Sequence, residues 1–209
     1  MGLLDHKEQS CPRNQSPNAK ILTDGFTRLV REYKAYSNKV FHTSVQMSTG
    51  SFEKWLPPPP GWIKINSNAA TITKARTGLG WVARDHEGRI LEVGVKRLKT
   101  QMSAEIAEAA AARWAIQCAS ERSWDRLIIE SDAKGLISKL HSGCKGRAYV
   151  DLLVDDIRSF LPCFRFLYAS HVKRLGNTVA HFVARMCLED GKCSVFRSTV
   201  PWSILMLAD

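Results

Sequence analysis

The sequence predicts an α/β domain with a mixed five-stranded sheet and helices on both of its faces. Three segments of strand character come first along the chain, and an alanine-rich segment with strong helix propensity follows them. Shorter strand and helix patterns then alternate, which implies crossover connections. We therefore expect three antiparallel neighbouring strands, with two more strands added to the sheet by crossovers.

The first strand is predicted at residues 61–70, directly after a run of prolines. Polar or aromatic residues occupy every second position, namely Trp62, Lys64, Asn66 and Asn68. Period-two alternation after such a stop is typical of a strand that opens a domain. Asn68 lies where the strand gives way to small residues, and this is the strand end at which α/β proteins usually place their sites.

The second and third strands are predicted at residues 77–83 and 89–98. The polar stretch between them ends in Gly88, which suits a hairpin connection. Residues 104–119 are rich in alanine and form the strongest helix signal in the chain. The small side chains would let this helix lie close to the sheet.

The remaining elements follow from apolar spacing and from glycine and proline breaks. They are a strand at 126–131, helices at 132–141 and 149–160, a strand at 164–172 and a helix at 177–188. The segment after them contains enough apolar residues to pack on the domain.

Four parts of the chain differ in composition. Residues 1–19 are polar and are predicted to be a disordered tail. Residues 20–60 combine an amphipathic helix with a proline-rich linker, and the helical part, 20–40, is a candidate site for a protein partner. The folded domain is predicted at 61–189, and 190–209 forms a C-terminal tail.

Composition narrows the class of partner and the compartment. The 209-residue chain carries a formal net charge of +10, which favours nucleic acid over an acidic membrane surface as its partner. Its six cysteines show no metal-binding spacing, which indicates a reducing, intracellular compartment, either nucleus or cytoplasm. No stretch approaches the roughly 18 apolar residues of a membrane span. We expect a soluble monomer.

Five short segments stand in order along about 130 residues, a usual domain size. They are Trp55 with the prolines and Gly61-Trp-Ile-Lys-Ile-Asn, the stretch 78–88, the stretch 107–115, Ile129-Glu-Ser-Asp, and His171-Val-Lys-Arg with Asn177 and Ala180-His. Together they resemble the ribonuclease H type 1 family, and more closely its plant, retrotransposon-derived, reverse-transcriptase-like version. The resemblance covers residues 55–188.

The resemblance implies a ribonuclease H-like fold and, ancestrally, a metal-dependent endonuclease that cleaves the RNA strand of RNA–DNA hybrids. Enzymes of this kind hold Mg²⁺ or Mn²⁺ with carboxylates from separate elements. The metal ions activate a water and stabilise the leaving oxygen. Carboxylates are needed because Mg²⁺ is a hard cation, and because each negative charge helps to hold two such ions close together.

Four positions of this chain correspond to the expected carboxylates. Glu108 matches the glutamate of the first helix and Asp132 matches the aspartate after the fourth strand, so both are implied catalytic residues and metal ligands. Asn68 stands in the position of the first aspartate, and His181 stands in the position of the last acid. An amide offers a metal no charge, and imidazole suits softer ions than Mg²⁺.

Structural roles are open for the same residues. Glu108 could be an ordinary helix-surface charge, since Glu105 lies one turn away. Asp132 could cap the helix that follows it, and Asn68 could serve only as a turn former. His181 could be a surface histidine.

Basic residues near the expected strand ends are candidates for contacting a nucleic-acid backbone. They are Arg84, Lys96, Arg97, Lys99, Lys173 and Arg174. The expected partner is an RNA–DNA hybrid or double-stranded RNA, recognised by shape rather than by sequence. Two alternatives to an active nuclease are a catalytically inactive nucleic-acid-binding module and a protein-interaction domain of the same fold.

Overall fold

The computed structural model describes residues 54–73, 76–143, 146–186, 192–197 and 200–206. Every described residue belongs to one compact unit, Ser37–Asp209. The predicted disordered tail, the amphipathic helix and most of the linker lie outside the described residues. Within the described ranges, no helix is both long enough and apolar enough to cross a membrane.

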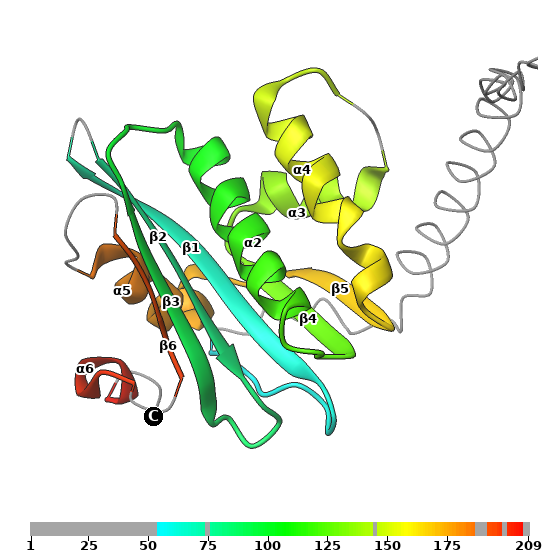
Figure 1. The fold of residues 1–209 in the computed structure, drawn as a ribbon, viewed down its shortest axis with the longest axis vertical. Helices are drawn as coiled ribbons and strands as arrows, with labels where there is room; N and C mark the ends of the chain where they lie inside the picture. Colours follow the sequence, from blue (N-terminus) through cyan, green and yellow to red (C-terminus); the bar gives the residue numbers. More distant parts are fainter. Residues whose placement is uncertain (1–53, 74–75, 144–145, 187–191, 198–199, 207–209) are drawn as a thin grey trace, which may run out of the picture. The chain divides into compact units, whose positions relative to one another are not determined.

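The domain is built on a six-stranded mixed sheet with the order β5-β4-β1-β2-β3-β6 (Figure 1). Its strands are β1 (Ile63–Thr73), β2 (Arg76–Arg84), β3 (Ile90–Leu98), β4 (Arg126–Ser131), β5 (Phe166–His171) and β6 (Cys193–Phe196). The first three strands are antiparallel neighbours, and β4 and β5 are added in parallel beside β1. The predicted arrangement of these five strands is confirmed.

The sixth strand corrects the predicted strand count. β6 comes from the segment that was predicted as a tail, and it pairs antiparallel with β3, with Val93 opposite Phe196. Four residues are too few to establish a period of two. The partner backbone that makes this segment a strand is supplied by β3, about one hundred residues earlier in the chain.

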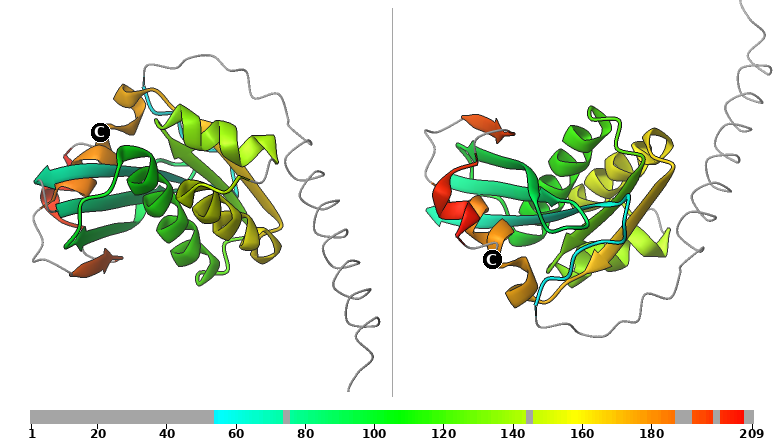
Figure 2. Two further views of the ribbon diagram at one scale, coloured as in Figure 1. Left: turned by 90° about the horizontal axis from the view of Figure 1, so that it is seen from above. Right: turned by 90° about the horizontal axis from the view of Figure 1, so that it is seen from below.

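Helices cover both faces of the sheet, as predicted (Figure 2). One face carries α2 (Ala104–Ser120), α3 (Lys134–Ser142) and α4 (Tyr149–Ser159), followed by the short 3₁₀ helix η1 (Leu161–Cys163). The other face carries η2 (Arg174–Asn177) and α5 (Thr178–Arg185), with α6 (Trp202–Leu205) beside α5. The last long helix was predicted at 177–188 and is observed at Thr178–Arg185, because the extended backbone of Met186 ends it.

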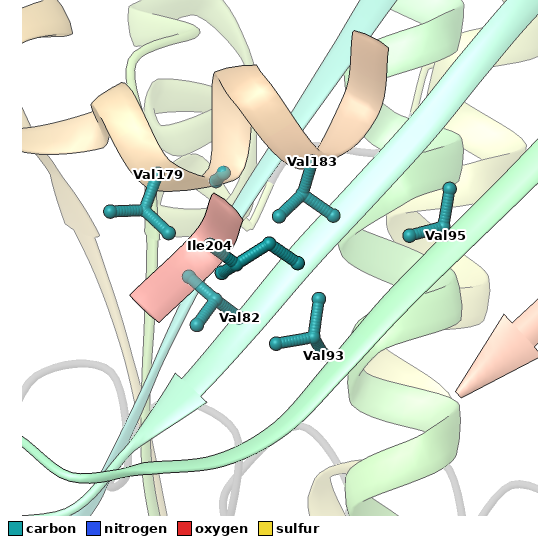
Figure 3. Packing of buried hydrophobic residues seen from close by; sticks show 7 residues of the cluster. Val82, Val93, Val95, Val179, Val183 and Ile204 are labelled. Carbon is teal, nitrogen blue, oxygen red and sulfur yellow. The ribbon is translucent and has the colours of Figure 1, made fainter. Parts of the chain in front are cut away.

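A cluster of buried aliphatic side chains joins α5 and α6 to the sheet (Figure 3). Val82, Val93 and Val95 from β2 and β3 pack against Val179 and Val183 of α5. Ile204 of α6 is completely buried in this cluster, so the apolar residues after the last predicted helix pack on the domain as expected.

Two glycines of β2 let α5 lie directly on the sheet. A Cβ added at Gly80 would lie 2.3 Å from the backbone nitrogen of Ala184, and one added at Gly78 would overlap the carbonyl oxygen of the same residue. Because no side chain separates the two backbones, α5 approaches β2 closely. This approach brings His181 to Asn68 in the middle of β1.

The residues just before β1 also contact the domain. The Trp55 ring lies 3.6 Å from the guanidinium carbon of Arg84. The Lys64 ammonium donates a hydrogen bond of 2.8 Å to the carbonyl of Leu56. The end of the predicted linker therefore covers one part of the sheet.

Candidate functional site

The four positions predicted from the sequence come together where β4 ends beside the middle of β1. β1 was predicted to end near Asn68, but it continues to Thr73 and pairs Asn68 with Gly80 of β2, so Asn68 is a strand residue and not a turn former. Asn68 Nδ2 donates a hydrogen bond of 2.7 Å to Asp132 Oδ1. His181 Nδ1 lies 3.1 Å from Asn68 Oδ1, and an amide oxygen only accepts, so this nitrogen carries the proton. Glu108 Oε1 accepts a hydrogen bond of 3.1 Å from the backbone N–H of Ala69.

The register of the sheet explains the meeting of Asn68 and Asp132. β1 and β4 run parallel, with Asn66 opposite Glu130. Asn68 and Asp132 each lie two residues beyond that pair, on the same face of the sheet. Their side chains therefore meet, although they are 64 residues apart in the chain.

Asn177 is a fifth polar side chain at this point, and the sequence reasoning assigned it no role. Its Nδ2 donates to Asp132 Oδ1 at 2.9 Å and to the carbonyl oxygen of Ser67 at 3.0 Å. Asp132 Oδ1 thus accepts hydrogen bonds from two amide groups. We call Asn68, Asp132 and Asn177 the amide clamp. The sequence did contain a signal for Asn177: it lies four residues, about one helical turn, before the site position His181.

The structure decides two of the open structural roles. Glu105 is exposed, whereas Glu108 is half-buried and faces the strand end, so Glu108 is not an ordinary surface charge. The N-cap position of α3 belongs to Ala133, so Asp132 does not cap that helix. A helix starting at Asp132 was predicted, but the Asp132 carboxylate instead joins the amide clamp.

The carboxyl of Glu108 holds its proton near neutral pH. Burial raises its pKa to about 8, the charge of Asp132 acts in the same direction, and the N–H of Ala69 acts against them. Its second oxygen, Oε2, is buried without a hydrogen-bond partner among the described residues. Asp132 is therefore the main negative charge at the site.

His181 is neutral for related reasons. Burial lowers its pKa, and the positive charges of Arg174 and Arg185 lower it further. Arg185 Nη1 lies 3.5 Å from His181 Nε2. The site is thus bordered by two cations and contains a neutral imidazole.

The stability of the protein should fall as the pH rises from 6.5 towards 8. Folding raises the pKa of Glu108 from 4.5 to about 8, so in this range the folded state keeps a proton that the unfolded chain has lost. The pKa of His181 is lowered from 6.5, and its opposite effect is confined to lower pH. Urea unfolding of the wild type and of Glu108→Gln at several pH values measures the contribution of Glu108 to this pH dependence. The variant should show a flatter pH profile, and identical profiles would contradict a buried, protonated Glu108.

The donor set does not fit a pair of Mg²⁺ ions. In the part of the chain that the structure describes, no three His, Cys, Asp or Glu side chains are grouped to hold a metal. One oxygen of Asp132 is engaged by two amide donors, and the oxygen of Asn68 faces the N–H of His181. Two oxygens at the site are buried without a hydrogen-bond partner among the described residues, Glu108 Oε2 and Asn177 Oδ1. Burial favours a proton on the Glu108 carboxyl, and the amide oxygen of Asn177 offers a metal no charge. The expectation of bound Mg²⁺ or Mn²⁺ gains no support from this geometry.

A cleft of about 340 Å³ opens beside Glu108 and Asp132. Small and acidic residues from α2 and from the start of α3 line it, namely Ala104, Glu105, Glu108, Asp132, Ala133, Gly135 and Leu136.

The predicted nucleic-acid contacts divide into exposed and buried groups. Lys99, Lys173 and Arg174 are exposed, and Lys96 is half-buried with its ammonium 5.7 Å from the Trp114 ring centre.

Two arginines of the predicted set are buried. Arg84 is 2% exposed and donates a hydrogen bond of 2.9 Å to Asn66 Oδ1. Arg97 is 4% exposed and donates to the carbonyl of Met186. Neither is placed to meet a polyanion at the surface. Their partners lie on distant segments, so the sequence pattern could not reveal this burial.

The combination of sheet order, covering helices and polar strand ends defines a ribonuclease H-like α/β domain. The structure is similar to RNase H1 from the halophilic archaeon Halobacterium salinarum NRC-1, with a TM-score of 0.54 and 18% identity over 58% of this chain and 93% of that one. It is also similar to LC11-RNase H1, isolated from compost, in complex with RNA/DNA hybrid, with a TM-score of 0.52 and 16% identity over 58% and 92% of the two chains. At these identities the likeness shows the fold alone.

A family model described as reverse transcriptase-like matches residues 66–187. The chain therefore belongs to the reverse transcriptase-like family of ribonuclease H domains. No curated protein sequence is similar enough to this chain to count as a match.

Proposed function

We propose that this protein binds double-helical nucleic acid, an RNA–DNA hybrid or double-stranded RNA, without cleaving it by a two-metal mechanism. The observation that carries the proposal is the amide clamp. Asn68 and Asn177 both donate hydrogen bonds to Asp132 Oδ1, so this oxygen is not free to bind a metal ion. Ancestral hydrolase chemistry is consistent with the family, because Glu108 and Asp132 keep their positions at the site.

The electrostatics of the site favour binding over hydrolysis. In a two-metal nuclease the cations offset the negative carboxylates, so that a phosphate can approach. Here the proton on Glu108 removes the charge of that carboxyl, and the two amide donors partly offset the charge of Asp132. A phosphodiester can then lie near the clamp with less repulsion, in reach of Arg174 and Arg185, which border His181.

Nucleic-acid binding can be tested by replacing exposed basic side chains. A double substitution of Lys173 and Arg174 to glutamine should weaken hybrid binding and reduce the salt slope of log K by about 2, because each lost phosphate contact contributes about 0.9. Arg147→Gln is the matched control, because Arg147 is also exposed but precedes α4 on the other face of the sheet. Fluorescence anisotropy with labelled hybrid measures both quantities. Equal, negligible affinity for every duplex would overturn the proposal.

Cleavage is tested separately on a labelled hybrid. The wild type should leave the RNA strand intact in Mg²⁺ and in Mn²⁺. The Asn68→Asp variant tests why the wild type does not cleave. If the variant cleaves the RNA strand and the wild type does not, the amide at position 68 is the reason for the lost activity. Cleavage by the wild type that disappears with chelator would show that the clamp opens to admit metal, and the proposal would be wrong.

Other parts of the sequence-based expectation stay predictions. They are the plant, retrotransposon-derived origin, the nuclear or cytoplasmic compartment, the monomeric state and a protein partner for residues 20–40. Deleting residues 20–40 and comparing the captured partners would test the last of these.

A further inference from the structure

A group of aromatic and basic side chains lies at the start of β1, away from the amide clamp at the middle of the strand. Trp62 precedes β1, Arg126 begins β4 and Phe166 begins β5, and the strand register places them in one row. Trp62 and Asn68 are six residues apart on one face of the sheet, which is about 20 Å along a strand. The two sites are therefore separate.

The aromatic rings form a connected surface. The Trp62 and Tyr168 rings are stacked, with centroids 5.2 Å apart and an interplanar angle of 25°. The Phe166 ring centroid lies 5.9 Å from that of Trp62. All three residues are half-buried, whereas Ile128, opposite Tyr168 in the register, is 3% exposed. The three rings thus lie over Ile128, and each ring is partly exposed to solvent.

Helix packing leaves this part of the sheet face open. The helices with the most extensive contacts to β4 and β5 are α2 and α3, which lie on the opposite face. On the near face, α5 packs on β1, β2 and β3. The aromatic row is therefore beyond the reach of the main helix on its own face.

Two arginines give the patch its charge. The guanidinium carbons of Arg126 and Arg165 lie 5.7 Å and 5.5 Å from the Phe166 ring centroid. Among the described residues, neither arginine forms an ion pair, while Glu130 on the same face is paired with Lys64 at 2.8 Å. The neighbouring acid is Asp125, which is exposed. An arginine stacked on a ring keeps its N–H edge free for a phosphate.

We propose that Trp62, Arg126, Arg165, Phe166 and Tyr168 form a binding surface for single-stranded RNA or DNA. The rings on β5 and just before β1, on either side of β4, offer stacking platforms for unpaired bases, and the flanking arginines follow the phosphates. A duplex cannot use the rings in this way, because its bases are already stacked and paired. The net charge of +10 favours a polyanion over an apolar protein surface, and so do two arginines that form no ion pair with the residues the structure describes. This surface is distinct from the duplex site proposed above and does not depend on it.

The test compares short labelled oligo(U) and oligo(dT) on the full chain, and these two arms separate RNA from DNA. Arg165→Gln should lower affinity about eightfold at 50 mM salt and reduce the salt slope by about 0.7, the contribution of one phosphate contact to a single strand. Arg147→Gln is the matched control, since both arginines are exposed. Phe166→Leu should weaken binding about fivefold or more with an unchanged salt slope.

Several results would overturn this inference. One is equal affinity of Arg165→Gln, Phe166→Leu and Arg147→Gln for both oligonucleotides, and another is no single-strand binding by the wild type. Sedimentation without nucleic acid measures self-association. If the wild type self-associates and Phe166→Leu does not, the patch binds a second copy of the chain instead. Hybrid affinity is a separate readout, because Arg165→Gln should leave it unchanged while the Lys173 and Arg174 substitutions reduce it.

Discussion

Replacing Asn68 by aspartate should lower the free energy of unfolding by about 3 kcal/mol in chelator at alkaline pH. The side chain is 2% exposed, and its Nδ2 lies 2.7 Å from Asp132 Oδ1. The substitution removes a hydrogen bond to a carboxylate and places a second carboxylate against it. Two such groups share a proton at lower pH, so the loss of stability should be smaller there.

Millimolar Mg²⁺ should return part of that stability to Asn68→Asp, because a cation bound only by the folded protein shifts unfolding. Urea unfolding with and without Mg²⁺ measures the recovery. Asn68→Ala is the control, since it removes the same hydrogen bond without adding charge, and Mg²⁺ should not rescue it. An Asn68→Asp protein as stable as the wild type in chelator would show that the amide clamp does not stabilise the fold.

Gly80→Ala should cost about 3 kcal/mol of stability, at the upper end for an overpacked core. The new Cβ would lie 2.3 Å from the nitrogen and 2.7 Å from the Cα of Ala184. These are backbone atoms, so the whole of α5 must move away from β2. His181 moves with the helix, and its 3.1 Å contact with Asn68 should weaken.

Gly135→Ala is the matched control for this effect. An added Cβ at Gly135, in α3, has no atom within 4 Å. Alanine is a better helix former than glycine, so this variant should be as stable as the wild type or more stable by up to about 1 kcal/mol. Urea midpoints of the two variants, with the His181 proton shifts, measure the result. Equal midpoints for both variants would show that α5 does not need the close approach.

The order and type of the main elements could be predicted because they depend on neighbouring residues. The alanine-rich helix was predicted at 104–119 and is observed at Ala104–Ser120, since high helix propensity is a local property. β6 was missed, because a four-residue strand on the edge of the sheet depends on its partner strand more than on its own pattern. The family resemblance likewise came from short segments whose order along the chain is visible without a structure.

The candidate site was only partly predictable. Asn68, Glu108, Asp132 and His181 were identified by position, and the structure brings all of them together at the middle of β1. Asn177 was overlooked, although it belongs to one of the resembling segments. Arginines at two strand positions looked like surface contacts, but the Trp55 ring and other distant groups bury them.

The sequence by itself predicted the fold class, the three antiparallel strands with two more added by crossovers, and Asn68 and His181 at positions where the family resemblance implies carboxylates. Only the tertiary structure decided that Asp132 is held by two amides, that Glu108 keeps a proton and which cations remain exposed. The physical reason is distance along the chain. Propensity and periodicity act between near neighbours, whereas hydrogen bonding and burial at this site join residues 39, 45 and 64 positions apart.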